Sequence, residues 1–505
     1  MMVIETVAPS EIGQVCAAYA KRGFRLQTMV GTDERRLSGA YVVRYLFVDD
    51  VAHETVECRA TIPADKPSYS SATPHVPAAD WYEREVFDLL GLRPVGHPRL
   101  EPLVLHGERL GEYYPLRKDF DIAAELPPVV RRVAPAALPD GYFEVPVGPI
   151  HAGVIEPGHF RFTMRGEVVE ALRADLFYTH RGLEKRAEGM PLADGLRIAE
   201  QACGVCSVSH ALSYAQAVEA LVNIAPPPAA GWIRVVLAEL ERLYNHVGDV
   251  GNICAGIGFS VGAMHGARLK EELQQLNDNV VGHRFLRGAV AVGGVAQGLG
   301  AAKRDQVRSA LERLTPDFSA LADVILSHGI VCDRLRDTGR LTPQAAARLG
   351  VVGPALRASG VSRDVRRDAP YAAYGALSIA VPTYPQGDVM ARLEQRIAEF
   401  FGSVALIQEA LWRLDSAPKP QPADLCAPLP SAAPFAYGVG VSESPRGENV
   451  HFVMANEHGA VERLRIRSAS YANWPAVTSA AVDNLIADFP LINKSFELCY
   501  ACCDR

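Results

Sequence analysis

Hydrophobic and polar residues alternate with two different periods in the first 120 positions. Three stretches rich in β-branched and aromatic residues predict strands at 24–30, 41–48 and 56–62. Residues 9–22 have helical composition, and Trp81, Phe87 and Leu90 recur at helical spacing until Gly91 marks a stop. This pattern predicts a small domain in which helices accompany a sheet.

Helical periodicity dominates after residue 140. Val236, Leu240, Leu243 and Val247 form the stripe of a helix that faces a core. Further helices are expected at 192–222, 262–300, 303–335 and 384–414. Strand-like composition returns at 148–162 and at 433–472. The expected fold class is α+β: a small N-terminal α/β domain followed by a large, mainly helical domain with minor β segments.

Prolines separate these two parts. Four of them are Pro127, Pro128, Pro135 and Pro139. Such a proline-rich stretch is typical of a semi-rigid linker. We therefore expect a first domain over 1–125, a linker over 126–144 and a second domain over 145–505. A length of 505 residues agrees with this division, because domains typically have about 100–200 residues.

Composition and charge exclude several classes of protein. The hydrophobic fraction of 49% and the charged fraction of 22% are those of a folded globular protein. A net charge of −7 over this length gives no field that would attract nucleic acid, so no nucleic-acid partner is expected. The first residues, with Glu5 and Glu11, do not form a secretory signal. The run at 288–302 is shorter than the about 20 residues of a membrane span, so membrane contact is expected through partners.

Four of the ten cysteines fall into two CxxC pairs, Cys203 with Cys206 and Cys499 with Cys502. In a helix or tight turn, residues three positions apart share a face, so each pair can direct two thiolates at one point. Such thiolates select zinc, an iron–sulfur cluster or another thiophilic metal. A structural zinc site is the simplest alternative. The pairs lie 293 positions apart, from 206 to 499, which is unlike the compact spacing of zinc ribbons.

The sequence around these pairs resembles a known family. EQACGVCSVSH at 200–210 and the CxxCxDR motif at 499–505 resemble the two metal-binding motifs of nickel–iron (NiFe) hydrogenase large subunits. The match is to the energy-converting group related to respiratory complex I. THRGLEK at 179–185 resembles the family's RGxE motif, and residues 352–374 are similar to the 49 kDa quinone-site subunit of complex I.

The N-terminal part extends this resemblance. DWYEREVFDLLGL and GHPRL are similar to segments of the 30 kDa subunit of complex I. A fusion of 30 kDa-like and 49 kDa-like parts is the arrangement of the large subunits of formate hydrogenlyase and hydrogenase-4 type. The resemblance covers nearly the whole chain.

The resemblance implies a ligand set for a Ni–Fe centre whose iron carries CO and cyanide. Cys203 and Cys499 would be terminal nickel ligands, and Cys206 and Cys502 would bridge nickel and iron. No set of cysteines then remains for an iron–sulfur cluster in this chain. Of the six others, the five at 16, 58, 254, 332 and 426 are expected to be core or loop residues.

Two further residues match catalytic positions of the family. Glu156, in EPGHFRF, stands where the family has a proton-carrying glutamate, and the alternative is a surface carboxylate in a loop. Arg446, in SPRGE, matches the arginine that the family holds over the open side of the centre, and the alternative is a solvated arginine at a turn. A guanidinium keeps its charge under all conditions, so it can act as a fixed electrostatic group.

Four supporting residues complete the implied site. Ser470 is expected to bond a cyanide ligand, although Ala469 replaces a proline usual in the family. His210 is expected near a bridging sulfur, with a helix histidine satisfied in the core as an equal alternative. Arg181 and Glu184 are expected to form a buried ion pair that supports the site.

The terminal motif departs from the family around its cysteines. Glu497 and Leu498 stand where the family has aspartate and proline, which puts the support of Cys499 in doubt, and Cys503 stands where threonine is common. Arg505 replaces a histidine that is a metal ligand in uptake hydrogenases, so no magnesium site is expected there.

Three functions remain open from the sequence. The first is a hydrogenase catalytic subunit, with an iron–sulfur small subunit similar to the 20 kDa subunit of complex I, a ferredoxin-like subunit and membrane-embedded complex I-like subunits as partners. It would lie in the cytoplasm, peripheral on the inner face of the membrane. The second is a complex I-like quinone-site subunit without nickel. The third is an assembly scaffold stabilised by zinc.

Overall fold

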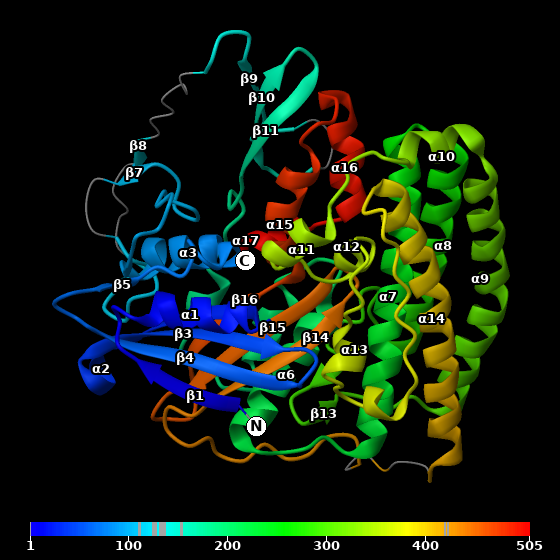
Figure 1. Ribbon diagram of the computed structural model, residues 1–505. Coiled ribbons are helices and arrows are strands. Elements are labelled where there is room, and N and C mark those ends of the chain that lie inside the picture. The colour runs from blue at the N-terminus through cyan, green and yellow to red at the C-terminus, as the bar shows by residue number, and fades with distance from the viewer. Residues whose placement is uncertain are drawn as a thin grey trace.

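The computed structural model describes residues 2–109, 113–123, 129–130, 138–151, 155–418, 421 and 424–505. Its N-terminal part is a four-stranded sheet in the order β1-β4-β3-β2 (Figure 1). The elements are β1 (Met2–Val7), α1 (Ile12–Lys21), β2 (Arg25–Glu34), α2 (Arg35–Ser38), β3 (Ala40–Asp49), β4 (Glu54–Pro63), β5 (Ser68–Ser70), η1 (Pro77–Ala79), α3 (Asp80–Leu90) and β6 (Arg93–Val95). The three predicted strands and both predicted helices are confirmed, and β1, parallel to β4, is additional.

The segment after α3 leads to a small separate sheet. Its elements are β7 (Glu108–Arg109), β8 (Val129–Val130), β9 (Phe143–Val147), β10 (His159–Arg165) and β11 (Val168–Asp175). Strands β9 to β11 form an antiparallel sheet that projects at the top of the molecule (Figure 1). The predicted β segment at 148–162 is wrong over most of its length, because the described residues before His159 form a loop. Most of the predicted linker lies outside the described residues, so it stays a prediction.

Long helices form the right side of the molecule (Figure 1). They and the short elements around them are α4 (Leu183–Arg186), α5 (Gly195–Glu200), α6 (Ser207–Val222), α7 (Pro228–Gly256), α8 (Ser260–Val281), β12 (Val290–Ala291), β13 (Gly294–Val295), α9 (Ala301–Ser327), α10 (Gly329–Leu335), α11 (Pro343–Arg348), α12 (Pro354–Arg357), α13 (Val365–Asp368), η2 (Tyr374–Ala376) and α14 (Val389–Ser416). Helix α7 packs against α8 and α14, and α8 packs against α9.

One predicted helix is too long. The stretch 262–300 was expected to be helical throughout, but α8 ends at Val281. Gly282 then adopts a left-handed conformation with φ of 85°, which glycine accepts without steric cost. The glycine-rich residues that follow form the β12–β13 hairpin. The other predicted helices fall on α5, α6, α7, α9, α10 and α14.

The C-terminal part forms a second sheet and the last helices. Its elements are β14 (Tyr437–Ser444), β15 (Gly447–Ala455), β16 (Val461–Arg467), α15 (Ala469–Ala480), η4 (Ile486–Asp488), α16 (Phe489–Phe496) and α17 (Tyr500–Asp504). Helix α6 packs against β14 and β15. Val30 and Leu46 of the N-terminal sheet form a small core with Phe452 and Met454 of β15. The C-terminal sheet is therefore held between α6 and the N-terminal sheet.

A buried charge cluster joins the N-terminal part to the C-terminus. Glu85 on α3 and Glu184 on α4 both bind Arg505, at 2.8 Å and 3.1 Å. Arg465 on β16 also pairs with both carboxylates, and Arg463 lies 2.7 Å from Glu184. Although burial acts in the opposite direction, these three arginines lower the pKa of Glu184. The cluster keeps both carboxylates ionised inside the protein.

We expect Glu85→Gln to lower the free energy of unfolding by about 3 kcal/mol, because removal of one partner leaves buried charge uncompensated. Urea unfolding of the full chain measures this loss. Glu409→Gln is the matched control, because Glu409 and Arg413 form a largely exposed pair that is worth less than about 1 kcal/mol. Equal midpoints for the two variants would contradict a structural role for Glu85.

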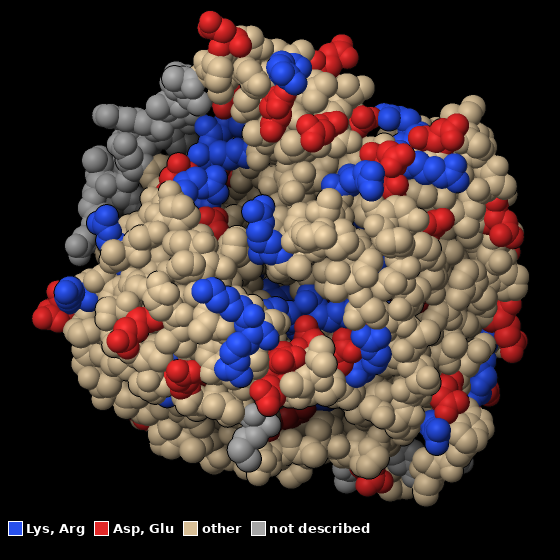
Figure 2. Space-filling model, in the orientation of Figure 1, with Lys and Arg blue, Asp and Glu red and all other residues tan. Residues whose placement is uncertain are grey.

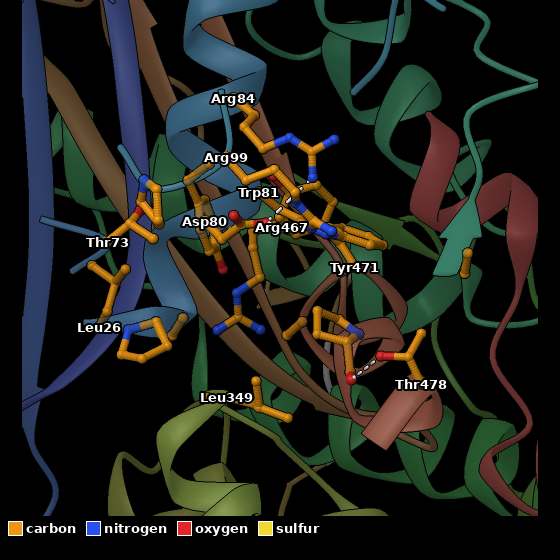
Figure 3. A pocket seen from close by; sticks show the side chains of 18 of the residues that line it. Leu26, Thr73, Asp80, Trp81, Arg84, Arg99, Leu349, Arg467, Tyr471 and Thr478 are labelled. Carbon is orange, nitrogen blue, oxygen red and sulfur yellow. Dashed lines mark hydrogen bonds and ion pairs between the residues drawn. The ribbon is translucent and has the colours of Figure 1, made fainter. Parts of the chain in front are cut away.

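Cavities lie along the boundary between the N-terminal part and the rest. One of about 510 Å³ lies between α3 and α15 (Figure 3), and we refer to it as the α3–α15 cavity. The surface is hollowed near the centre of the face drawn in Figure 2, with basic side chains at the edge of the hollow. A second cavity of about 820 Å³ lies between β2 and α13.

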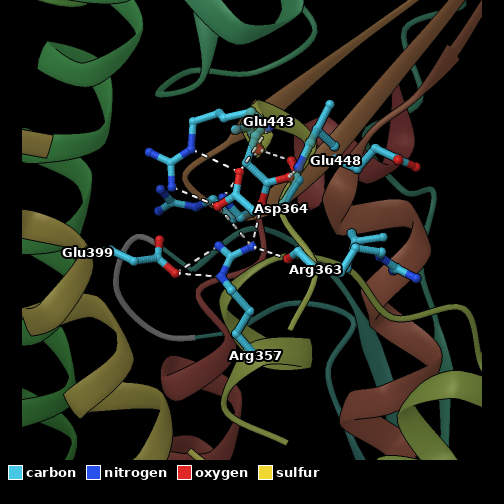
Figure 4. A network of polar contacts seen from close by, with 12 residues as sticks. Arg357, Arg363, Asp364, Glu399, Glu443 and Glu448 are labelled. Atoms are coloured by element: carbon cyan, nitrogen blue, oxygen red, sulfur yellow. Dashed lines mark hydrogen bonds and ion pairs between the residues drawn. The ribbon is translucent and has the colours of Figure 1, made fainter. Parts of the chain in front are cut away.

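A second buried network crosses the helical part (Figure 4). Arg357 on α12 lies 2.8 Å from Glu399 of α14, 2.8 Å from Glu443 of β14 and 3.4 Å from Asp364. Burial, and then the charge of Asp364, raises the pKa of Glu443 to about 7. An acid whose pKa is higher in the folded chain takes up protons on folding. The free energy of unfolding therefore falls as pH rises from 4.5 to about 7 through this group.

We expect Glu443→Gln to remove this fall, which at about 1.4 kcal/mol per pKa unit amounts to roughly 3 kcal/mol. Urea unfolding of the variant and the native chain at a series of pH values between 4.5 and 7.5 measures the difference. Glu409→Gln should leave the pH dependence unchanged. A fall of the same size in both Glu443→Gln and the native chain would assign the dependence to other groups.

Candidate metal centre and its surroundings

Four thiols from two distant segments meet in one buried cluster. Cys203 and Cys206 precede α6, and Cys499 and Cys502 lie at the start of α17. Cys203, Cys206 and Cys502 are buried and Cys499 packs against them. The Cys203 thiol contacts the other three, and all four are free of disulfides. The fold therefore joins the two CxxC pairs, 293 positions apart, in one donor set.

Two buried carboxylates hold the segments that carry these cysteines. Glu241 of α7 accepts hydrogen bonds from the backbone N–H groups of Val208 and Ser209, at 2.6 Å and 3.0 Å, and so caps the first turn of α6. Asp504 accepts from the backbone N–H and the hydroxyl of Thr179, at 3.0 Å and 2.8 Å. A carboxylate at a helix N-terminus satisfies donors that have no partner within the helix. Glu241 thus fixes the first pair of thiols from α7, and Asp504 ties the segment of the second pair to Thr179.

The thiols suit a thiophilic cation. Contacts from the other three thiols lower the pKa of Cys203. Contact with the Cys203 thiol and burial raise the pKa values of Cys206, Cys499 and Cys502. Four thiolates together in a buried site repel one another, and a bound metal ion removes that repulsion. Within the described ranges, no group of three or more His, Cys, Asp or Glu side chains has, as it stands, the geometry to hold a metal ion. Metal binding would therefore require the side chains to adjust.

Glu156 lies directly beside the cluster. Its Oε2 accepts hydrogen bonds from the backbone N–H groups of Tyr500 and Ala501, at 3.0 Å and 3.2 Å, and lies 4.0 Å from the Sγ of Cys499. The loop reaches α17 because Gly158 lacks a side chain, since a Cβ there would come within 2.7 Å of the Tyr500 ring. The structure thus places Glu156, a partly exposed loop residue, beside Cys499, and its role in proton transfer stays a prediction.

Arg446 is also buried at the cluster. It lies at the turn between β14 and β15, where its Nε donates to the Glu497 carbonyl at 2.9 Å and a terminal nitrogen lies 3.0 Å from Asp249. A third bond goes to the Asn245 side chain. Its positive charge favours the thiolate form of Cys206 and so acts to lower the pKa of that thiol. The alternative of a solvated arginine is therefore wrong.

Ser470 and His210 contact the second cysteine pair. The Ser470 hydroxyl accepts a hydrogen bond from the Cys499 backbone N–H at 3.1 Å. The Nε2 of His210 lies 3.2 Å from the Sγ of Cys502, and burial lowers the pKa of this histidine to about 4. The imidazole is therefore neutral and can donate one hydrogen bond to sulfur.

Comparisons with known proteins agree with this site. Family models match residues 5–126 ("Respiratory-chain NADH dehydrogenase, 30 Kd subunit"), 181–249 ("Nickel-dependent hydrogenase") and 256–433 with 430–505 ("Respiratory-chain NADH dehydrogenase, 49 Kd subunit"). Formate hydrogenlyase subunit 5 of Escherichia coli is 35% identical over 96% of this chain and 86% of its own length. Hydrogenase-4 component G of the same organism is 34% identical over 95% of this chain and 84% of its own. The chain belongs to the complex I-related hydrogenase large subunits.

Other relatives of this hydrogenase large subunit come from membrane complexes. The membrane-bound hydrogenase subunit alpha of Pyrococcus furiosus is 31% identical over 72% of this chain and 88% of its own. A solved structure of an archaeal membrane-bound sulfane sulfur reductase aligns with a TM-score of 0.67 and 26% identity, over 72% of this chain and 99% of that chain. None of the described helices is long and apolar enough to cross a membrane.

One expected contact of this hydrogenase large subunit is wrong. Arg181 and Glu184 do not pair with each other. Arg181 is exposed, and its guanidinium donates to the carbonyl oxygens of Gln201, Ala202 and Ala501. Glu184 binds the three arginines of the buried charge cluster instead. Arg181 therefore ties the two cysteine segments together through their backbones.

Several residues at the site lie outside the sequence motifs. Asn245 and Asp249 lie one helical turn apart on α7 and both bind Arg446. Two polar residues four positions apart on a buried helix face are the signal that could have found them. Ser468 caps α15 and donates to the Cys502 carbonyl at 2.9 Å. Cys503 is fully buried beside the site, which shields the extra thiol from solvent.

Proposed function

We propose that this chain interconverts protons and electrons with molecular hydrogen, 2H⁺ + 2e⁻ ⇌ H₂, at a Ni–Fe centre. The observation that carries this proposal is the buried cluster of four thiols, formed from two distant segments of a hydrogenase large subunit. Cys203 and Cys499 would hold nickel as terminal ligands, and Cys206 and Cys502 would hold both nickel and an iron that carries CO and cyanide. The centre supplies the redox change and the site at which hydrogen reacts.

Glu156 carries protons between the cluster and solvent in this proposal. Its carboxylate lies 4.0 Å from the Cys499 sulfur and is partly exposed. The N–H groups of Tyr500 and Ala501 hold one carboxylate oxygen in place, which leaves the other oxygen to exchange a proton. A fixed carboxylate within reach of a thiol is the geometry required of a general acid and base.

Arg446 and its partners set the electrostatics on another side of the cluster. The charge of Arg446 is compensated by Asp249 and oriented by Asn245, so the guanidinium cannot turn away. A fixed cation in a dry site stabilises negative charge on nearby sulfur. We propose that Arg446 orients the reactants, that Ser470 positions Cys499 and that His210 donates to the Cys502 sulfur.

Electrons must reach the site through another chain. The six cysteines outside the proposed ligand set include none grouped with two others away from the cluster, and iron–sulfur clusters are usually held by four cysteines. We propose an iron–sulfur small subunit as the direct electron partner, together with a ferredoxin-like subunit and membrane-embedded subunits. The membrane-bound relatives support a peripheral position, which we place on the inner face of the membrane.

Metal analysis and infrared spectroscopy of the purified chain with its partners test this proposal. We expect one nickel per chain and infrared bands of CO and cyanide bound to iron. A chain that contains zinc alone would support a scaffold. A metal-free chain would support a complex I-like role. This alternative rests on the 31% identity to an NADH-quinone oxidoreductase subunit of Streptomyces griseus. Either result would overturn the hydrogenase assignment for this chain.

A further inference from the structure

The α3–α15 cavity is separate from the proposed catalytic site and has no role in the reaction above. Its walls come from the start of α3, the end of β11, the residues after α11 and one face of α15. A volume of about 510 Å³ lies within the range of small-molecule sites, about 300–1,000 Å³. The cavity can therefore hold a molecule of one or two rings.

Aromatic side chains line the inner wall of this cavity (Figure 3). The rings of Trp81 and Tyr82 meet the ring of Tyr471 edge-on, with centroids 5.5 Å and 5.0 Å apart. Pro475 and Leu349 add apolar surface to the lining. Such a wall favours a flat, apolar group, because aromatic rings gain from contact with another ring.

The hydroxyl of Tyr471 has no hydrogen-bond partner among the described residues, although only 1% of the side chain is exposed. The guanidinium groups of Arg505 and Arg465 lie over its ring, at 4.7 Å and 5.2 Å from the centroid, so the ring cannot swing out to find one. Burial raises the pKa of Tyr471, and the hydroxyl therefore remains a donor. A buried donor without a partner is costly, and the residue that carries it lines the cavity.

The side of the cavity around Asp80 carries more positive than negative charge. Asp80 is the carboxylate partner of both Arg84, at 3.3 Å, and Arg99, at 3.7 Å. Arg99 is about half exposed, with 49% of its side chain accessible, so its donors are largely free. Arg173, in contrast, is compensated by Glu101 and Asp175. The unbalanced charge of Arg84 and Arg99 suits an anionic group.

We propose that the α3–α15 cavity binds a small aromatic anion, with its ring against Trp81 and Tyr471, its charge at Arg84 and Arg99, and an acceptor atom at the Tyr471 hydroxyl. The cavity and the thiols share the start of α15, since Tyr471 lines the cavity and the neighbouring Ser470 bonds Cys499. Occupation of the cavity would therefore fix the helix that supports Cys499.

Fluorescence titration of the full chain with two probes tests this proposal. Anilinonaphthalene sulfonate is an aromatic anion, and N-phenylnaphthylamine has the same rings without the charge. Energy transfer from the four tryptophans of the chain reports binding of either probe, and the variants place it. We expect Arg99→Gln and Tyr471→Phe each to weaken sulfonate binding by about three- to tenfold, the loss of one charge-assisted hydrogen bond. Binding of the neutral amine should not change in Arg99→Gln.

Two variants outside the cavity serve as controls. Arg165→Gln removes an exposed arginine on the β10–β11 hairpin, and Tyr384→Phe removes a phenol hydroxyl elsewhere. Both should bind the sulfonate like the native chain. The proposal is overturned if the sulfonate binds all four variants equally, or if it binds the native chain no more tightly than the amine does. Tyr471→Phe removes an unpartnered buried hydroxyl, so its urea midpoint should be no lower than that of the native chain.

Discussion

The rate of hydrogen-dependent dye reduction should fall by far more than 100-fold in the Cys502→Ser variant, and the variant should purify without nickel. Changes to residues that merely support metal ligands cost about 10–100-fold, and loss of a ligand exceeds that cost. A serine hydroxyl is a hard donor that stays protonated at neutral pH, so it cannot replace a soft thiolate. Cys502 also contacts Cys203 and His210, so the change removes the sulfur that these residues share.

Cys503→Ser is the sharpest control for this result. Cys503 is the next residue on α17 and is fully buried, but it does not belong to the thiol cluster. We expect this variant to keep its nickel and most of its activity. Nickel that is retained in Cys502→Ser, or lost to the same extent in both variants, would show that the ligand assignment is wrong.

Glu156→Gln should slow hydrogen-dependent dye reduction by about 100-fold or more, the usual contribution of a positioned acid or base, while nickel content remains that of the native chain. A glutamine oxygen can still accept from the N–H groups of Tyr500 and Ala501, so the side chain should keep its place. Only its capacity to carry a proton is lost. Exchange of hydrogen with deuterium from solvent should slow in parallel with dye reduction.

Glu170→Gln provides the comparison for that variant. Glu170 lies on β11 and pairs with the exposed Arg165, so its replacement should leave both activities unchanged. Near-native exchange in Glu156→Gln would assign proton transfer to another group. Loss of nickel in Glu156→Gln would instead reveal a structural role for this carboxylate.

Local patterns were enough to predict most helices and strands. The spacing of Trp81 and Leu90 correctly predicted α3, and the runs of β-branched residues correctly predicted β2 to β4. The pattern failed where a single residue ends an element, as Gly282 does after α8. Periodicity reports the face of a helix that is buried, but it carries little information on where the backbone stops repeating.

Long-range pairing explains the errors at the site. The resemblance to the RGxE motif led to the prediction that Arg181 and Glu184 pair with each other. Three arginines that are distant in sequence bind Glu184, and the THRGLEK motif contains neither Arg505 nor Arg463. The contact of Arg446 with Asp249 likewise spans 197 positions. The resemblance of the motifs identified Arg446 and Glu156 as candidates, but only the fold shows which groups hold these side chains in place.

The contact between Glu85 and Arg505 has a consequence for how the two parts of this protein stay together. Each bond of the buried charge cluster that crosses from α3 joins the 30 kDa-like part to the 49 kDa-like part. When two such parts are separate polypeptides, their docking depends on the concentration of each. A short covalent connection replaces that dependence with a local concentration of the order of millimolar. Dilution of the cell contents therefore cannot separate Glu85 from the arginines that it neutralises.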